Sequence, residues 1–397
     1  METLDKKIFG TLFFSIFAAV TGVGVVVPLL PIYAHDLGAS GLYIGLIFGA
    51  FSISRTVFLP WFGRLSDLKG RKPFIVPGFL AYALISIAFI YSETVSTLIV
   101  IRLFHGIASA MLMPVIQAYI GDITPKGREG VTMGVFNMSL FLGLSVGPLV
   151  GGVIKDHFNL QTSFICMGLL ALVGFFLCLW LLPPTRSERG FIRAEQPFSW
   201  KPILYDTQVV GLFSFRFAYV FCVGIIWGFI PLYADQRFAA SSSLIGVLIM
   251  LGVFVSGLIH IPMGYLADRI SKKLMVVAGG MIVSYAILSF AWAERLSDLI
   301  QATVFFGLGG GISMPALMAM AVLKGNRINA MGSMMALMTM AHSTGMLGGA
   351  LLGGMMMDLF QLQMAFPLGG SVMLVCTVLF LAGPYHEKSV LRGGPRA

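Results

Sequence analysis

Long apolar stretches separated by short polar segments run along the whole chain. Each stretch is about 20 residues long, the length that an α-helix needs to cross the hydrocarbon core of a bilayer. The pattern predicts an all-α polytopic membrane protein, because a soluble fold has no place for so many long apolar segments. The twelve predicted transmembrane helices lie at 8–33, 42–62, 74–92, 95–119, 131–154, 162–182, 208–233, 243–265, 274–292, 298–321, 331–356 and 364–383.

One polar segment, 183–207, is longer than the other connections and divides the helices into two groups of six. The second group repeats the first, since "PIYA" at 31–34 matches "PLYA" at 231–234 and further Gly and Pro positions match at offsets of 200 to 202. Because six is even, both copies have the same orientation, as in transporters built from parallel repeats. We therefore expect two pseudo-symmetric six-helix bundles and a cytoplasmic linker, with boundaries at 1–182, 183–207 and 208–397.

Composition and charge add one point to this prediction, the orientation of the chain in the membrane. The chain is 57% apolar and 11% charged, against about 25% charged in soluble proteins. Its net charge of +9 could indicate nucleic acid as a partner. However, twenty of the 26 Lys and Arg fall in segments that are cytoplasmic if the N-terminus is, and only three fall in outer loops. This positive-inside bias predicts a multi-pass protein of the plasma (cell inner) membrane with both termini cytoplasmic, and no nucleic acid partner.

A ten-residue polar loop, "GRLSDLKGRK" at 63–72, has a near copy, "GYLADRISKK", at 264–273. Gly63 would let two antiparallel helices approach closely. Asp67 could cap the N-terminus of the following helix, where a negative charge is favoured. The alternative is that the charges only set topology, but topology alone would not require Gly63 and Asp67.

The charges of this loop have an acidic partner in the first half only. Arg71 and Lys72 can reach Asp122, at the cytoplasmic end of the fourth predicted helix. In the second half Leu323 replaces that aspartate, although Asp268 is retained in the loop. We therefore expect the first copy to carry the functional cluster.

Four segments together resemble the major facilitator superfamily over nearly the whole chain. The loop 63–72 fits the pattern G-x-x-x-D-x-x-G-[RK]-[RK], and "IRLFHGIASAMLMP" at 101–114 resembles the motif of the fourth helix. "LGLSVGPLVGG" at 142–152 and "PLLP" at 28–31 resemble motifs of the twelve-span drug:proton antiporter branch.

This resemblance implies a secondary active transporter that works by alternating access, here expected to be proton-coupled efflux of small amphipathic compounds. The alternative is a transporter of a specific organic anion or metabolite, which could be an importer. The resemblance also implies that the charged cluster latches the cytoplasmic side shut in the outward-facing state. The residues expected in this cytoplasmic gate are Gly63, Asp67, Gly70, Arg71, Lys72, Asp122 and Asp268.

The fifth predicted helix carries a stripe of small residues with a proline among them. Small residues at every fourth position let helices pack closely. The resemblance adds a second reading, in which this helix seals the cavity and moves against the other half. The residues concerned are Gly143, Gly147, Pro148, Gly151 and Gly152.

Three arginines lie at hydrocarbon depth, where a charge costs about 2.5–3.5 kcal/mol on insertion scales. Such residues face a cavity or a partner, although Arg55 and Arg216 could instead extend to the interface. His105 lies one turn from Arg102 on the same face. The candidates for the substrate cavity or proton coupling are Arg102, His105, Arg216, Arg55 and His342.

All 17 acidic residues lie in loops or at helix ends. A proton relay through a buried carboxylate is therefore in doubt, and Asp36, Asp206, His105 or His342 would have to replace it. Buried cations without buried anions also favour anionic or neutral substrates over lipophilic cations.

Other classes of function have little support. No metalloprotease motif, nucleophile elbow or phosphate-binding loop is present, which disfavours an enzyme and a nucleotide-driven pump. A receptor built on the same fold remains open. We expect no catalytic residue, metal or cofactor, and a monomer in the lipid bilayer with a small-molecule substrate and protons as coupling ion.

Overall fold

In a computed structural model the chain is helical throughout the residues that it describes, which are 5–125, 129–183, 206–267, 269–327 and 331–383. No strand occurs in these ranges. Twelve helical segments are long and apolar enough to cross a membrane. The predicted fold class, an all-α protein with twelve transmembrane helices, is thus confirmed.

The first half runs from Lys6 to Leu181. Its first span is broken by a 3-10 turn at Pro28, since proline removes a backbone donor and fixes φ. The elements are α1 (Lys6–Val26), η1 (Val27–Leu29), α2 (Leu30–Asp36), α3 (Gly41–Lys69), α4 (Lys72–Ile90), α5 (Val95–Ile123), α6 (Glu129–His157) and α7 (Leu160–Leu181).

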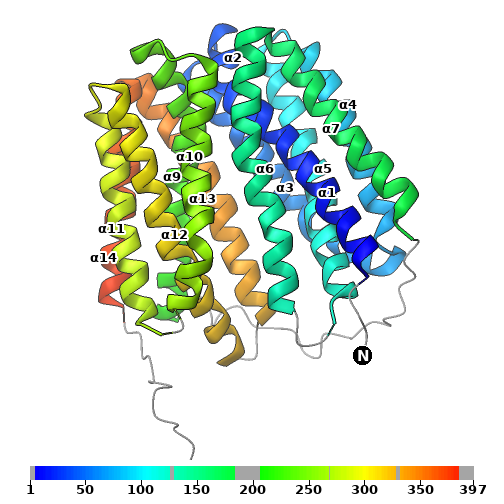
Figure 1. Cartoon of the computed structure of the whole chain (residues 1–397). Helices are drawn as coiled ribbons and strands as arrows, with labels where there is room; N and C mark the ends of the chain where they lie inside the picture. Colours follow the sequence, from blue (N-terminus) through cyan, green and yellow to red (C-terminus); the bar gives the residue numbers. More distant parts are fainter. Residues whose placement is uncertain (1–4, 126–128, 184–205, 268, 328–330, 384–397) are drawn as a thin grey trace, which may run out of the picture.

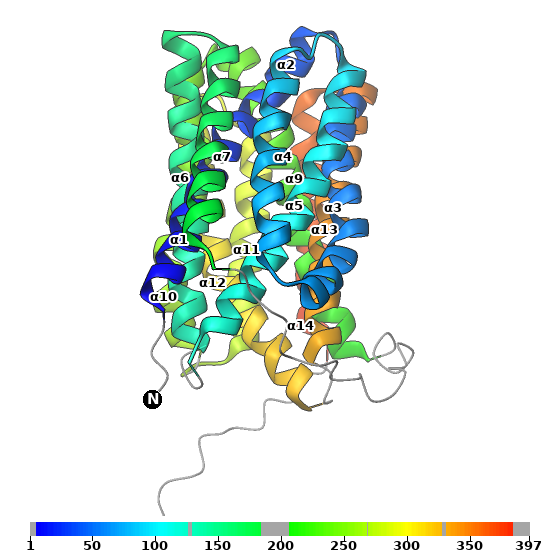
Figure 2. The same ribbon diagram turned by 90° about the vertical axis from the view of Figure 1, so that its right-hand side faces the viewer.

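The second half runs from Thr207 to Ala382. Its elements are α9 (Thr207–Phe238), α10 (Ser242–Ala267), α11 (Lys272–Ala291), α12 (Leu296–Arg327), α13 (Met331–Leu359), η2 (Leu362–Met364) and α14 (Ala365–Ala382). Figure 1 shows the two halves side by side, with the first in blue to green and the second in green to red. Figure 2 views the molecule from the side of the first half, with the second half behind it.

The helices of the two halves pack in the same pattern. In the first half α1 packs on α6 and α7, α3 on α5, and α4 on α5 and α7. In the second half α9 packs on α13 and α14, α10 on α12, and α11 on α12 and α14. Across the halves α6 packs on α10 and α3 on α13. These four helices therefore form the interface between the bundles.

Capping residues recur at matching positions of the two halves. Asp5 accepts hydrogen bonds from the first turn of α1, and Asp206 does so for α9. Lysines serve the C-terminal ends of two other helices. The Lys72 ammonium donates to the last carbonyls of α7, and Lys273 donates to the carbonyl of Gly383 after α14. These contacts satisfy helix-end groups that have no partner within their own helix.

Candidate functional site

A cluster of basic side chains lies where the two halves meet, away from the ends of the helices that carry it. Arg216, on α9, donates from Nη2 to Nδ1 of His342 on α13 at 3.3 Å. A guanidinium group has no acceptor, so Nδ1 accepts and His342 is the neutral tautomer that carries its proton on Nε2. A second Arg216 nitrogen, Nη1, lies 2.9 Å from the sulfur of Met314 on α12.

Two further basic residues belong to this interface cluster, which we define as Arg55, Arg216, His260 and His342. Arg55, on α3 of the opposite half, interacts electrostatically with His342, and Arg216 interacts in the same way with His260 on α10. The structure thus brings together three of the five residues proposed for the cavity or for proton coupling, namely Arg55, Arg216 and His342. His260 was not among those five, and its signal in the sequence was its polarity within a predicted helix.

Arg102 and His105 are placed elsewhere, inside the first bundle. Their side chains are only 3% and 1% exposed. Arg102 donates to the carbonyl of Ile47 at 3.2 Å and to Nδ1 of His105 at 3.2 Å, and it lies over the ring of Phe51. This arginine is therefore held by α3 and by its own helix, and its hydrogen bonds go to Ile47 and His105 and not to Arg216 or His342. It lies on the side of α3 where Tyr82 interacts electrostatically with both Arg102 and Arg55.

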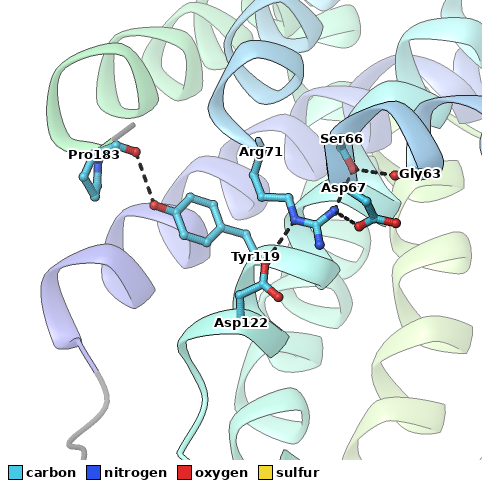
Figure 3. A network of polar contacts seen from close by, with 7 residues as sticks. All are labelled: Gly63, Ser66, Asp67, Arg71, Tyr119, Asp122 and Pro183. Atoms are coloured by element: carbon cyan, nitrogen blue, oxygen red, sulfur yellow. Dashed lines mark hydrogen bonds and ion pairs between the residues drawn. The ribbon is translucent and has the colours of Figure 1, made fainter. Parts of the chain in front are cut away.

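The charged cluster of loop 63–72 is present at the end of the molecule where α1 begins, the predicted cytoplasmic face (Figure 3). The Arg71 guanidinium bridges two carboxylates, at 2.5 Å from Asp67 and 3.0 Å from Asp122, and donates to the Ser66 hydroxyl at 2.7 Å. The contact between Arg71 and Asp122 is the one expected from the sequence. All of these residues belong to α3, to the turn after it or to α5, so the cluster ties elements of one half together.

Several details of this loop differ from the sequence prediction. The second span does not end at 62, because α3 continues to Lys69 and leaves a turn of two residues. Gly63 makes no close helix contact, since a methyl group there would meet no atom within 4 Å. Gly70 is the glycine that the turn requires, with φ at +87°.

Two polar residues of the loop also have other partners than expected. Asp67 does not cap α4, whose N-cap residue Arg71 makes no side-chain capping bond; Asp67 pairs with Arg71 instead. Lys72 donates to the carbonyls of Leu179 and Leu182. Asp268, the acidic residue of the second copy, lies outside the described residues.

The small residues of α6 face two different neighbours. Three of them pack on α1 within the same half: Gly143, Gly147 and Gly151. A methyl group at Gly147 would lie 2.6 Å from the carbonyl of Thr21 and 2.7 Å from Gly24. This face therefore serves close packing inside one bundle.

The other face of α6 meets the opposite half. A methyl group at Gly152 would overlap the backbone of Ser242 at the start of α10, and one at Gly246 of α10 would overlap the carbonyl of Pro148. Gly152 and Pro148 are thus the part of the stripe that lies between the bundles.

Two carboxylates that the sequence analysis did not single out connect the halves at the predicted outer face. Asp156, at the end of α6, accepts from the backbone N–H groups of Ser242 and Ser243 at 2.9 and 2.7 Å. Asp358, at the end of α13, accepts in the same way from the first two residues of α3, at 2.6 and 2.8 Å. Each carboxylate therefore caps a helix of the opposite bundle. The available signal was that both are acidic at matching positions of the repeat.

Asp206 was considered from the sequence as a substitute proton carrier. In the structure it caps α9 and pairs with Lys324. Partial burial by itself would raise the pKa of Asp206, but its hydrogen bond and ion pair with Lys324 at 2.5 Å, and the N–H groups of α9, outweigh burial and lower that pKa. The carboxylate therefore stays ionised near neutral pH and joins α9 to α12.

Comparison with known proteins decides the family. The model of the Major Facilitator Superfamily matches residues 12–237 and 212–397. The chain belongs to the major facilitator superfamily. As a member of this superfamily it is a multi-pass membrane transporter with a small-molecule substrate, and not an enzyme.

Individual relatives cover nearly the whole of this superfamily member. It is 29% identical over 367 residues to an uncharacterized MFS-type transporter of Methanocaldococcus jannaschii, covering 90% of this chain and 93% of that protein. It is 27% identical over 381 residues to Multidrug resistance protein 2 of Bacillus subtilis, covering 94% of both. The solved structure of the nucleoside transporter NupG shares the fold, with a TM-score of 0.79 at 14% identity over 94% of this chain and 99% of NupG.

Proposed function

We propose that this transporter exports small amphipathic compounds across the plasma membrane in exchange for protons. The observation that carries the proposal is the similarity to Multidrug resistance protein 2, which extends over 94% of both chains and thus includes both bundles and their interface. The proposal places both termini in the cytoplasm, because the basic residues concentrate on that side. It takes the monomer as the working unit, since one chain supplies both bundles.

Transport would proceed by rocking of the two bundles about the interface cluster. The outer ends are held together by the Asp156 and Asp358 caps, and close backbone contacts continue inward, where a methyl group at Gly45 of α3 would meet Leu351 of α13 at 3.0 Å. Substrate would then enter from the cytoplasm. Separation of the outer ends would release it outside.

The cytoplasmic cluster is the counterpart of this outer closure. Arg71 holds the ends of α3 and α5 in one geometry through Asp67 and Asp122. In our proposal this fixed surface meets the second half when the cytoplasmic side closes. Exposed ion pairs contribute only about 0–1 kcal/mol each, which suits a contact that must also open.

For proton coupling we favour His342. It is neutral in the structure because it accepts from Arg216, and it lies at the interface where both bundles can control its access to water. Protonation of Nδ1 would break that hydrogen bond and place a third positive charge beside Arg55 and Arg216. Proton binding would therefore change how the halves meet, which is what coupling requires.

The decisive experiment is transport of norfloxacin by purified protein in liposomes with an imposed pH gradient. For an exporter that exchanges protons, an acidic lumen should drive accumulation through inverted molecules, and nigericin should abolish it. The His342→Gln variant should transport without responding to the gradient. If parent protein moves norfloxacin equally well with and without the gradient, proton coupling is refuted; if it moves no amphipathic compound, a specific metabolite carrier replaces the proposal.

A further inference from the structure

Positive charge at the interface of the halves has no acidic partner among the residues that the structure describes. Arg55 comes from α3 of the first bundle and Arg216 from α9 of the second, and both act electrostatically on His342. Among the described residues neither arginine forms an ion pair. Guanidinium groups from opposite halves therefore both act electrostatically on one neutral histidine, and Arg216 also donates a hydrogen bond to it.

The hydrogen-bonding capacity of these arginines is also unfilled. Arg216 has a buried Nε–H without a partner, and its Nη1 faces only a thioether sulfur, which is a weak acceptor. Arg55 makes no hydrogen bond with the described residues. A buried donor left without an acceptor is unfavourable, and more so when it is charged. No described residue therefore supplies an acceptor to the Arg216 Nε–H.

Arg102 shows how the same protein treats an arginine that needs no ligand. Its guanidinium donates to the Ile47 carbonyl and to His105, and it lies 4.4 Å from the centroid of the Phe51 ring. It is almost fully enclosed, whereas Arg55 and Arg216 are only partly buried. Arg102 is thus a packed arginine, whereas Arg55 and Arg216 remain available to a ligand.

Aromatic and thioether groups lie beside the unfilled donors. Met314 touches Arg216, and the ring of Phe141 on α6 lies 5.5 Å from that of His260. Tyr219, one turn after Arg216, stacks on Phe306 at 5.6 Å. A ligand held by the arginines would therefore have apolar surface against its body.

We propose that the interface cluster binds the anionic group of an amphipathic organic anion, a carboxylate or sulfonate attached to an aromatic body. Arg216 donates to the anion through Nε and a terminal nitrogen, in the paired geometry that guanidinium favours with carboxylates. Arg55 contacts the same anion from the other half, so the bound ligand bridges the bundles. This inference rests on the proposed transport function and specifies its substrate class.

The test compares three compounds with one aromatic body and different charge: naphthylacetate, naphthylacetamide and naphthylethylamine. Binding of each radiolabelled compound is measured by equilibrium dialysis with the full chain in nanodiscs of zwitterionic lipid, so no transport is required. We expect naphthylacetate to bind about tenfold or more tightly than the other two, since only its carboxylate can accept the paired, charge-assisted hydrogen bonds of a guanidinium group.

The variants assign this preference to the cluster. Arg216→Gln and Arg55→Gln should each reduce naphthylacetate affinity about tenfold and leave naphthylacetamide unchanged, and Arg216→Lys should restore part of the loss. Arg237→Gln, which removes an arginine at the far end of the same helix, is the matched control and should change nothing. Retention of folding is checked by Tm in each variant.

The binding results test the anion site, and the transport results test the proposed function. Equal affinity for the three compounds, or a preference for naphthylacetate that survives both glutamine variants, overturns the inference and leaves efflux of norfloxacin untouched. If naphthylacetate binds tightly and in an arginine-dependent way, but neither naphthylacetate nor norfloxacin is transported in liposomes, the anion site is upheld and the proposed function is refuted.

Discussion

At the scale of single residues, Arg71 organises the cytoplasmic cluster. Its guanidinium contacts Asp67, Asp122 and Ser66 together. Removing one carboxylate leaves the other in place, so the cluster should weaken and not collapse. We expect Asp67→Asn to lower the transport rate about two- to fivefold, in line with about 0–1 kcal/mol for an exposed ion pair. Membrane insertion should be unaffected.

The repeat supplies the matched control for this variant. Asp268→Asn alters the equivalent position of the second loop, where Leu323 stands in place of the second carboxylate. Its effect on transport of norfloxacin in liposomes should be smaller. Equal losses in the two variants would contradict the view that the first cluster alone controls the cytoplasmic side.

A second residue-scale prediction concerns the turn after α9. Ala239 has φ at +47°, in the left-handed region, whereas the first half has Gly38 in the equivalent turn with φ at +83°. A side chain in this region costs about 1 kcal/mol, which glycine avoids. Ala239→Gly should therefore raise stability by about 0.5–1 kcal/mol, and Gly38→Ala should lower it by a similar amount. Thermal unfolding in detergent measures both, and a lower Tm for Ala239→Gly would contradict the argument.

At the scale of helices, the sequence predicted the number, order and repetition of the spans but not all of their ends. The apolar pattern marks hydrocarbon depth, so it stopped the second span at 62, whereas α3 continues as a polar helix to Lys69. Capping by Asp67 was wrong for the same reason, because the turn lies beyond that residue. Which face of α6 touches which neighbour also could not be read from glycine spacing alone.

The packing of α6 on α1 gives a prediction within one helix. A methyl group at Gly147 would lie 2.6 Å from the Thr21 carbonyl, and the neighbouring atoms are backbone, which cannot move aside cheaply. Gly134 of the same helix has open space. Gly147→Ala should lower the Tm by several degrees, as overpacking costs about 1–3 kcal/mol. Gly134→Ala should be neutral or slightly stabilising, since alanine favours helix. Equal Tm values for the two variants would refute the close contact.

The junction between α9 and α12 gives a pH-dependent prediction. The folded-state pKa of Asp206 is lowered, so its carboxylate stabilises the fold above the unfolded pKa of about 3.9 and loses this contribution as the pH falls through the folded-state value. Asp206→Ala should cost about 1 kcal/mol at pH 7 through loss of the cap and the Lys324 pair. Its Tm difference from the parent should be constant between pH 5 and 8 and shrink as the pH falls past about 4. A difference that disappears already near pH 6 would contradict this assignment.

At the scale of the whole molecule, the sequence indicated which residues carry charge at membrane depth but not how they group. It placed Arg102 and His105 with Arg216 and His342, because all four lie inside predicted transmembrane helices. The grouping depends on which face of each helix turns toward the interface. That face is hidden in the sequence because the spans are apolar on their exposed faces as well as on their buried ones. Asp156 and Asp358 were missed because a helix-end aspartate gains meaning only when the facing helix start is known.

These two aspartates lead to a prediction about the transport cycle. Each caps the start of a helix in the opposite bundle, so both bonds must break when the outer side opens. Charged caps of this kind contribute about 0.5–2 kcal/mol each. Removing both, with Asp156→Ala and Asp358→Ala, should raise the population of the outward-open state about tenfold, since about 1.4 kcal/mol corresponds to one factor of ten.

Accessibility of a buried position at the outer face measures this population. Ile44, one turn inside α3, is fully buried, so a cysteine there in a background without the four native cysteines should react slowly with a membrane-impermeant maleimide. The double variant should react about tenfold faster. Asp298→Ala is the control, because this outer aspartate accepts from Glu294 and Arg295 of its own half and spans no interface. If the control also reacts faster, or if the double variant reacts no faster than the parent, the carboxylates stabilise single helices and do not hold the outer side closed.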